Sequence, residues 1–327
     1  MAWKNLKQLG LVDGFLIEHK ALTELDEVNA LIDWVRIENF LSNIHAKPQG
    51  EKSWPPVMMF KALLLQSWYG LSDPGLEKQL ARDLLFRRFV GLGIAESVPD
   101  HSSIWRFRQI LEKNGLLTKL QEDINNQLAE QGLIVRAGEV SIIDASVIEA
   151  KNCRPNKGVD GQCTQDPEAA WNVKNGSDGK RKSTYGFKGH LNVDEDGFIK
   201  KTDFGSGNVH DSQYFEGLLT GNEEAAYADS AYQSKAHDSL LEDQGIDNRL
   251  IKRAYRNRSL TQKEKEHNRR HSPVRSTVER VFGVLKLHYG MAKARYDGLV
   301  RNRTRFNLMC IAYNLKHGLS VLQGKCA

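Results

Sequence analysis

The chain has little of what several classes of protein depend on. It contains four cysteines in 327 residues, and no two of them form a C-x-x-C pair: Cys153, Cys163, Cys310 and Cys326. We therefore expect free thiols rather than a disulfide scaffold or a zinc site. The longest apolar stretches fall far short of the ~20 residues that cross a bilayer. The first ten residues lack the apolar core of a signal peptide, so we expect a cytoplasmic protein without membrane contact.

Positive charge is concentrated in one part of the chain. A hydrophobic fraction of 40% and a charged fraction of 27% are ordinary for a globular protein, and the net charge is only +5. Between Ile251 and Arg305, however, 16 Lys and Arg stand against 4 Asp and Glu. Such concentration is typical of a surface that binds a polyanion. The alternative is a solvated basic face with no partner.

The first part of the chain, residues 1–135, has the pattern of an all-helical domain. Apolar residues recur at helical spacing, and turns rich in Gly and Pro separate the segments. A helix that begins near Asp100 would bury Ile104 and Leu111 and expose four polar residues: Ser103, Arg106, Gln109 and Lys113. This favours a helix-turn-helix that binds DNA ends or mediates dimerisation. An ordinary three-helix bundle with a polar outer face is the alternative.

The pattern changes at about residue 136, and residues 136–327 predict a mixed β-sheet flanked by helices. Residues 140–148 form a β-branched run, and a hairpin is expected at residues 189–202. A strand at 225–229, a helix at 234–244, a strand at 248–251 and helices at 273–288 and 301–319 complete the order. The polar residues 151–185 predict a long loop, which in such a domain is usually functional or mobile.

Three acidic residues occupy positions that suit metal-dependent chemistry. Asp144 lies inside the first strand, where an unpaired carboxylate is costly. Asp229 ends a later strand, where ligand sites of α/β sheets collect, and Glu279 lies on a helix. Carboxylates suit Mg²⁺ or Mn²⁺, and two such ions can act on both oxygens of a phosphodiester displacement. Each acid alone is more often a cap or a solvated charge.

The helix around Glu279 carries a second pattern. Arg275, Glu279 and Lys286 fall on one stripe, with Gly283 between them. A carboxylate for a metal, flanked by cations for phosphates, would suit DNA cleavage. The alternative is an ordinary i,i+4 ion pair of ~0.3–0.5 kcal/mol.

Several segments resemble bacterial insertion-sequence transposases of the DDE type. Residues 275–286, RSTVERVFGVLK, resemble the signature in which an Arg precedes the catalytic Glu by four residues and a Lys follows it by seven. Residues 227–232 and 143–146 resemble the blocks around the two catalytic Asp residues. Further likeness lies in residues 68–72, 98–104, 185–190 and 208–211. The chain is most similar to the insertion-sequence-five family, although Ser272 stands where that signature often has Tyr.

The resemblance implies a ribonuclease-H-like catalytic fold and a transposase, a DNA recombination enzyme of a mobile element. It implies Asp144, Asp229 and Glu279 as catalytic and metal-binding residues, with two Mg²⁺ ions for which Mn²⁺ could substitute. We hypothesise that Asp144 bridges both ions while Asp229 and Glu279 complete one shell each. The expected reaction is hydrolysis at the terminal inverted repeats, followed by attack of the 3′-OH on target DNA.

Double-stranded DNA is the expected partner, in the bacterial cytosol or nucleoid, and a homodimer or larger assembly is expected on it. Besides the four residues of the helix-turn-helix, the predicted DNA contacts come from the sheet, the basic segment and the signature helix: Lys188, His190, Arg253, Arg256, Arg258, Arg269, Arg270, Arg275, Arg280 and Lys286. Two alternatives remain, a ribonuclease-H-like nuclease without strand transfer, and a repressor derived from a transposase.

Overall fold

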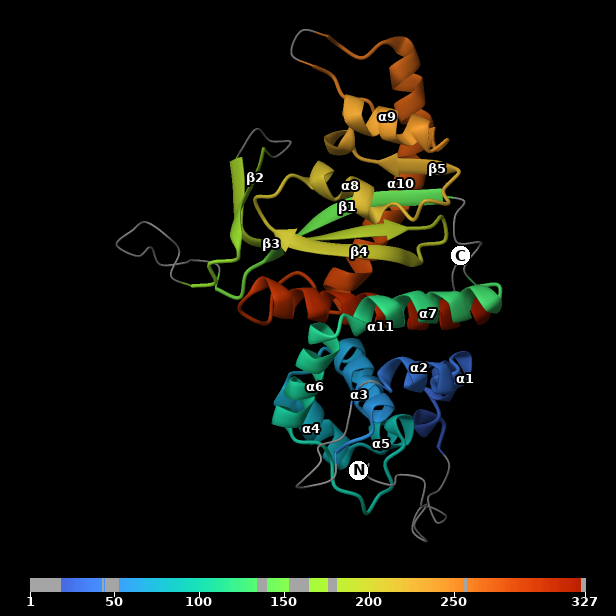
Figure 1. Ribbon diagram of the computed structural model, residues 1–327, viewed down its shortest axis with the longest axis vertical. Coiled ribbons are helices and arrows are strands. Elements are labelled where there is room, and N and C mark those ends of the chain that lie inside the picture. Colours follow the sequence, from blue (N-terminus) through green and yellow to red (C-terminus); the bar gives the residue numbers. More distant parts are fainter. Residues whose placement is uncertain are drawn as a thin grey trace. The chain divides into compact units, whose positions relative to one another are not determined.

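The computed structural model describes residues 19–42, 44, 53–133, 140–152, 165–175, 181–255 and 258–324 (Figure 1). The chain divides into two units, Met1–Leu133 with Asn307–Ala327, and Ile134–Phe306. The sequence had placed residues 307–327 with the second part of the chain. In the structure they pack with the first unit, because Trp68 donates its indole N–H to the Ala312 carbonyl at 2.8 Å.

Every described element of residues 19–133 is helical. In order they are η2 Lys20–Leu22, α1 Asp26–Leu31, α2 Trp34–Leu41, α3 Pro56–Trp68, α4 Asp73–Arg82, α5 Leu84–Val90, α6 His101–Lys113 and α7 Leu116–Glu130. Helix α3 is buried almost all round, as its run of Met, Phe and Leu requires. Gly91 ends α5 with φ of 81°, a left-handed conformation that glycine adopts without strain.

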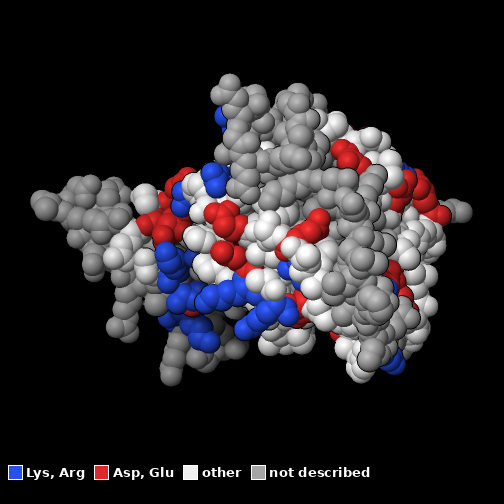
Figure 2. All heavy atoms as spheres, turned by 90° about the horizontal axis from the view of Figure 1, so that it is seen from below, with Lys and Arg blue, Asp and Glu red and all other residues white. Residues whose placement is uncertain are grey.

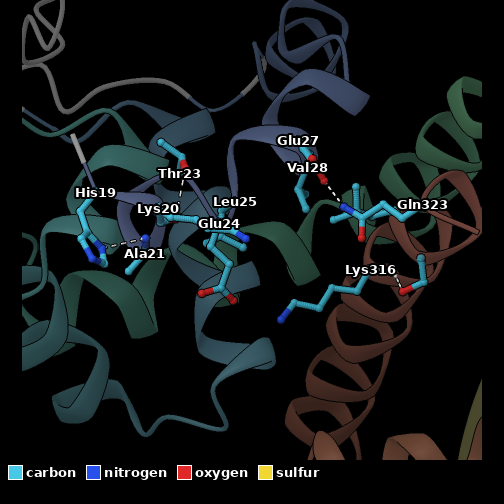
Figure 3. A pocket seen from close by; sticks show the side chains of 12 residues that line it. His19, Lys20, Ala21, Thr23, Glu24, Leu25, Glu27, Val28, Lys316 and Gln323 are labelled. Carbon is cyan, nitrogen blue, oxygen red and sulfur yellow. Dashed lines mark hydrogen bonds between the residues drawn. The ribbon is translucent and has the colours of Figure 1, made fainter. Parts of the chain in front are cut away.

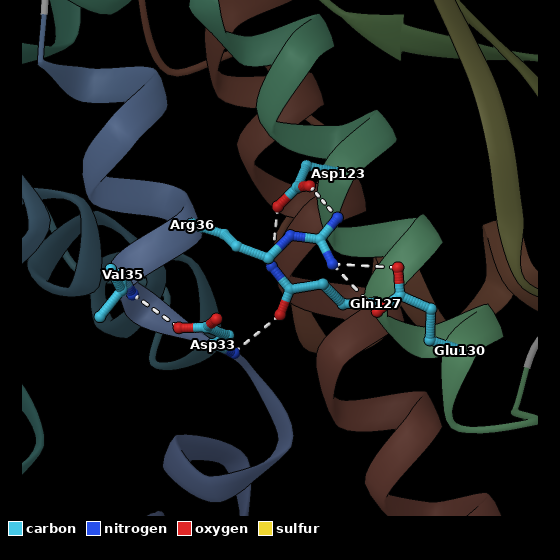
Figure 4. A network of polar contacts seen from close by, with 6 residues as sticks. All are labelled: Asp33, Val35, Arg36, Asp123, Gln127 and Glu130. Carbon is cyan, nitrogen blue, oxygen red and sulfur yellow. Dashed lines mark hydrogen bonds and ion pairs between the residues drawn. The ribbon is translucent and has the colours of Figure 1, made fainter.

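Polar contacts tie the outer helices of this unit together. Arg36 on α2 lies 2.6 Å from Asp123 and 2.9 Å from Glu130, both on α7 (Figure 4). The backbone N–H of Asp33 donates to Gln127 at 2.7 Å and so fixes the start of α2 to the same helix.

A cavity of about 630 Å³ lies between η2, α1 and the C-terminal end of α11 (Leu299–Leu322) in the first unit. Lys316 extends toward Glu24 there, and Gln323 donates to Glu27 (Figure 3). Burial lowers the pKa of Lys316, and the charge of Glu24 opposes that shift. The lining mixes two lysines with two glutamates, Lys20 and Lys316 with Glu24 and Glu27, so the cavity has no excess charge of either sign.

The second unit is a mixed α/β structure, as the sequence predicts. Its strands are β1 Val140–Glu149, β2 Ala170–Asn175, β3 Arg181–Val193, β4 Ile199–Ser206, β5 Ala225–Ala228 and β6 Asp247–Asn248. They form one sheet of order β2-β3-β1-β5-β6, and β4 pairs with β3. The β1–β3, β2–β3 and β3–β4 pairs are antiparallel, whereas β1–β5 and β5–β6 are parallel.

Helices cover both faces of this sheet. One face carries η3 Asp211–Tyr214, α8 Phe215–Leu218 and α9 Lys235–Asp243, whose Phe215, Leu218 and Leu241 pack on Ile143 and Ala228. In Figure 1, α8 lies in front of β1 and α10 (Gln262–His288) behind it. The short η4, Ser230–Tyr232, follows β5.

Two predictions about elements were wrong. The segment 151–185 was predicted as a loop, but it contains β2 and the first residues of β3. Its many Gly, Asn and Lys residues hid the alternation of Trp171 and Val173 with polar neighbours. The predicted helix at 273–288 begins earlier, at Gln262, with a capping box between Thr261 and Glu264. Pro273 had been taken as its start but lies inside the helix.

No described helix is both long and apolar enough to cross a membrane. Cys310 is a free, buried thiol, and the other three cysteines lie outside the described residues.

Candidate active site

Strands β1 and β5 bring Asp144 and Asp229 together. The parallel register pairs Ile142 with Tyr227 and Ile143 with Ala228, so the two acids stand one position beyond the last pair. Register partners on neighbouring parallel strands lie ~5 Å apart and point to the same face of the sheet. Both carboxylates are partly buried, and each accepts the N–H of the next residue, at 2.8 Å for Asp144 and 2.6 Å for Asp229.

Glu279 is connected to this pair through Arg275. The Arg275 Nη2 lies 2.5 Å from Glu279 Oε1 one helical turn away, and its Nη1 lies 3.4 Å from Asp144 Oδ2. The buried residues of α10, including Val278, Val281 and Leu285, hold the helix against the sheet so that Arg275 reaches β1. One cation therefore sits between carboxylates of two separate elements.

The charges of Asp144 and Asp229 both affect the pKa of a third residue, Tyr232. Its side chain is 1% exposed, and burial raises its pKa well above the ordinary value. The charges of Asp144, Asp211 and Asp229 add to that shift, because a phenolate would be repelled by each of them. Asp144 and Asp229 thus both act on one buried hydroxyl. The sequence analysis missed Tyr232, although it lies in the block 227–232.

The donor set fits a divalent cation chemically. Three carboxylates supply the oxygen ligands that Mg²⁺ and Mn²⁺ prefer, and the place of Arg275 shows that a positive charge is accommodated between Asp144 and Glu279. Among the described residues, no three Asp, Glu, His or Cys side chains are already arranged to hold a metal ion. Binding of a metal ion would therefore require the carboxylate side chains to reorient and the Arg275 side chain to move away from Asp144 and Glu279.

Lys188 and His190, predicted as DNA contacts, are both buried, at 5% and 0% exposure. Lys188 lies 2.8 Å from Asp211 and donates to the Val209 carbonyl at 2.8 Å. The His190 ring stacks on Tyr214 with centroids 4.0 Å apart, and burial lowers its pKa to about 4. Packing of η3 and α8 over β3 covers both side chains, so neither is presented to DNA in this structure.

The predicted basic residues of the second unit are mostly at the surface. Those that are exposed are Arg253, Arg258, Arg269, Arg270 and Arg280, while Arg256 lies outside the described residues. Lys286 is half-buried on α10. Arg258 lies 2.7 Å from Glu264, and Arg280 donates to Thr277 at 3.2 Å. On another face, seen from below in Figure 2, Lys and Arg also gather in one region.

Helix α6 presents its polar residues as predicted. Arg106 and Lys113 are exposed, while Ser103 and Gln109 are partly exposed. Asp100 caps the helix by accepting the Ser103 N–H at 2.9 Å. Trp105, 39% exposed, lies on the same outer side and was not singled out from the sequence. Arg108 is buried instead, where it pairs with Asp73 and donates to Gln66, so that α6 is held to α3 and α4.

Two family models match this chain. Residues 136–315 match the family model described as a transposase DDE domain, and residues 16–110 match one described as a transposase domain of the DUF772 type. A solved structure, the piggyBac transposase synaptic complex with hairpin DNA, is similar with a TM-score of 0.41 and 12% identity. That similarity covers 94% of this chain and 76% of the other.

Proposed function

The chain belongs to the family of transposases with a DDE domain, and we propose that it cuts DNA at the terminal inverted repeats of a mobile element and joins the freed 3′-OH to target DNA. The observation that supports this most directly is the gathering of acids described above. Asp144 and Asp229 directly follow the last parallel register pair of β1 and β5, and Arg275 links Asp144 to Glu279. Among bacterial elements, the insertion-sequence-five family is the proposed relative.

We further propose a ribonuclease-H-like fold for the catalytic domain, which begins at about residue 136, preceded by a helical DNA-binding domain, residues 1–135. The sheet supports this, because antiparallel β4, β3 and β1 continue into parallel β5 and β6. The first acid then lies on the central strand and the second at the end of its parallel neighbour, where α/β sheets collect ligands.

Asp144, Asp229 and Glu279 are the residues that would hold two Mg²⁺ ions. When bound, divalent cations would stabilise the charge that develops on the phosphodiester oxygens. Arg275 and Lys286 would bind the phosphates next to the cut, since both stand on the stripe of α10 that carries Glu279. The buried Tyr232 and the Lys188–Asp211 pair would keep the floor of the site rigid.

Double-stranded DNA is the proposed substrate and partner. The exposed arginines of residues 253–280 would bind its backbone, and α6 would bind the terminal repeat through Arg106, Gln109 and Lys113. Joining two ends in one event requires a dimer or larger assembly on DNA.

The test uses a plasmid that carries the gene with its flanking DNA, incubated with the purified protein and Mg²⁺. We expect nicks at both element ends and strand-transfer products. Asp144→Asn, Asp229→Asn and Glu279→Gln should each lower cleavage by at least ~10³-fold while DNA binding persists. Glu195→Gln, at an exposed hairpin acid, is the matched control. Cleavage that survives Asp229→Asn would refute the site. Nicking without joining would indicate a nuclease, and binding without cleavage a repressor.

A further inference from the structure

A hairpin at the edge of the sheet takes no part in the candidate active site. It consists of β2, residues 170–175, and the first half of β3, residues 181–186, and is called the β2–β3 arm below. Within the described strands, β2 pairs only with β3 and so ends the sheet. Figure 1 shows β2 at the left edge, at an angle to β1 and β4.

The arm exposes two large apolar side chains, and one of them is aromatic. Trp171 is 45% exposed and Val173 is 42% exposed. Alternate residues of a strand point to the same side, so both belong to one face of the arm. The inner side of the Trp171 ring packs on Tyr185, with centroids 5.3 Å apart and planes at 56°. Tyr185 is buried and donates its hydroxyl to the Asp166 carbonyl at 2.9 Å, so the indole is held in place and partly open to solvent.

The sequence of the hairpin is predominantly basic. Residues 170–186 include four Lys and Arg and one acid, Asp178. Arg181 and Lys182 are exposed. The register places Arg181 on the face of the arm that carries Trp171 and Lys182 on the opposite face. An exposed aromatic ring beside cations is the combination with which proteins bind nucleic acid, the ring stacking on a base and the cations holding phosphates.

The base of the arm is fixed. Two acids at the base of the arm, Asp166 and Glu168, accept the N–H groups of Gly298 and Leu299 near the start of α11, both at 3.0 Å. Carboxylates at a helix N-terminus are stabilised by the helix dipole. Asn172 also donates to the Gly207 carbonyl at 3.0 Å. The arm thus starts from a rigid point, and these acids do not neutralise its outer part.

The sheet register relates the arm to the candidate active site. Asp144 pairs with Leu191 and Trp171 pairs with Tyr185, and directly opposed residues share a face. Because Tyr185 and Leu191 are both odd-numbered positions of β3, Trp171 and Asp144 belong to the same face of the sheet. Six residues of strand separate Tyr185 from Leu191, which is at most ~20 Å at ~3.3 Å per residue. Six nucleotides of one strand, at ~3.4 Å each, cover that distance.

We propose that the β2–β3 arm is a binding site for unpaired bases of the DNA substrate, with Trp171 as the stacking platform and Arg181 and Lys182 as phosphate ligands. This inference rests on the proposed function for the identity of the partner. It adds a recognition element within about six nucleotides of the candidate acids. A base that stacks on the outer side of Trp171 would cover indole surface that is now open to water.

The test is a binding measurement in EDTA, where no cleavage occurs. The probes are a labelled duplex of about 30 base pairs with a ~10-nucleotide single-stranded tail, and the same duplex with blunt ends. Trp171→Ala should weaken binding of the tailed probe by ~5–100-fold and leave the blunt probe nearly unchanged, whereas Trp171→Phe should keep most of the affinity. Arg181→Ala with Lys182→Ala should lower the salt slope for the tailed probe by ~1–2 units. Leu322→Ala, an exposed apolar residue of the first unit, is the control.

The outcomes separate this inference from the proposed function. It is overturned if Trp171→Ala binds both probes like the unchanged protein, or weakens both equally. It is also overturned if Trp171→Ala only abolishes self-association in sedimentation, which would make the arm a contact with a second copy. Thermal melting of Trp171→Phe and of the double variant shows whether the fold is kept. The plasmid assay could show no cleavage while Trp171→Ala still weakens binding of the tailed probe alone. In that case the proposed function is refuted, and the assignment of the arm as a binding site for unpaired bases is retained.

Discussion

The Arg275 guanidinium on α10 lies 3.4 Å from the Asp144 carboxylate on β1, across 131 positions of sequence. It also pairs with Glu279 at 2.5 Å. The guanidinium therefore occupies the position between two carboxylates at which a divalent cation would bind. The side chain of Arg275 is 20% exposed and that of Asp144 likewise, and partial burial strengthens such a pair. Arg275 thus neutralises the acids when no metal is bound.

Replacing Arg275 should therefore strengthen metal binding while weakening the metal-free fold. In EDTA, we expect Arg275→Gln to lower the melting temperature by ~2–4 °C, because Asp144 and Glu279 lose their shared counter-charge. Mn²⁺ should raise the melting temperature more in the variant, since the ion no longer competes with the guanidinium. The measurement is thermal denaturation across a Mn²⁺ titration. Arg280→Gln, exposed on the same helix, is the control. Equal Mn²⁺ responses in both variants and the unchanged protein would contradict the idea.

Lys188 should contribute to the stability of the fold rather than to DNA binding. It pairs at 2.8 Å with Asp211, and the two side chains are only 6% and 15% exposed. Lys188→Met would leave that carboxylate buried without a counter-charge, at a cost of ~3–5 kcal/mol of unfolding free energy in urea. Adding Asp211→Asn should recover part of the loss. A direct contact with DNA would give the opposite result, namely weaker binding at unchanged stability.

The sequence could predict the acids because each stands at a recognisable point. Asp144 interrupts a β-branched run, Asp229 ends a short apolar strand, and Glu279 shares a helical stripe with Arg275. These are local patterns, whereas the parallel pairing of β1 and β5 is known only from the structure. The link from Arg275 to Asp144 is not local, since it depends on how α10 lies across the sheet.

The burial of Lys188 and His190 could not be predicted in this way. In the sequence GFKGHLN, charged and ring residues alternate with glycines, which is typical of a strand with one solvated face. The structure covers that face with η3 and α8, and it is Asp211 and Tyr214 of η3 that accommodate the two polar side chains. The segment 208–211 was singled out as a motif, but its partner was not identifiable from spacing. The strand β2 was missed because Gly and Asn surround a run of only six residues.

The basic segment, residues 253–270, should account for most of the salt dependence of DNA binding. Arg253, Arg258, Arg269 and Arg270 are exposed and lie outside the candidate acid site. If each binds one phosphate, replacing all four by Ala should reduce the slope of log affinity against log salt by ~3–4 units. Fluorescence anisotropy with a duplex at several salt concentrations measures this. Lys119→Ala with Lys235→Ala removes two exposed charges elsewhere and should leave the slope unchanged. An unchanged slope in the fourfold variant would mean that this segment is a solvated face.

The hairpin between β3 and β4 should give the protein a pH-dependent stability. Asp194 is 5% exposed, and burial raises its pKa to about 7, against the hydrogen bond it accepts from the Phe198 N–H at 2.8 Å. Its other oxygen has no partner among the described side chains and backbone. Because the folded state holds this proton up to a higher pH than the unfolded chain, the residue costs stability as the pH rises from about 4 to about 7.

Asp194→Asn keeps the acceptor for Phe198 and removes the titration. The variant should therefore match the unchanged protein near pH 4 and exceed it by ~1–3 kcal/mol of unfolding free energy at pH 8. His190 acts in the opposite direction, because its pKa of about 4 lies below the ordinary value, so its contribution falls as the pH drops below ~6.5. Because both proteins contain His190, its effect cancels in the difference between their unfolding free energies. Urea denaturation at pH 5 and pH 8 measures that difference, and a gain of the same size at both values would show that Asp194 is ionised in the folded protein throughout.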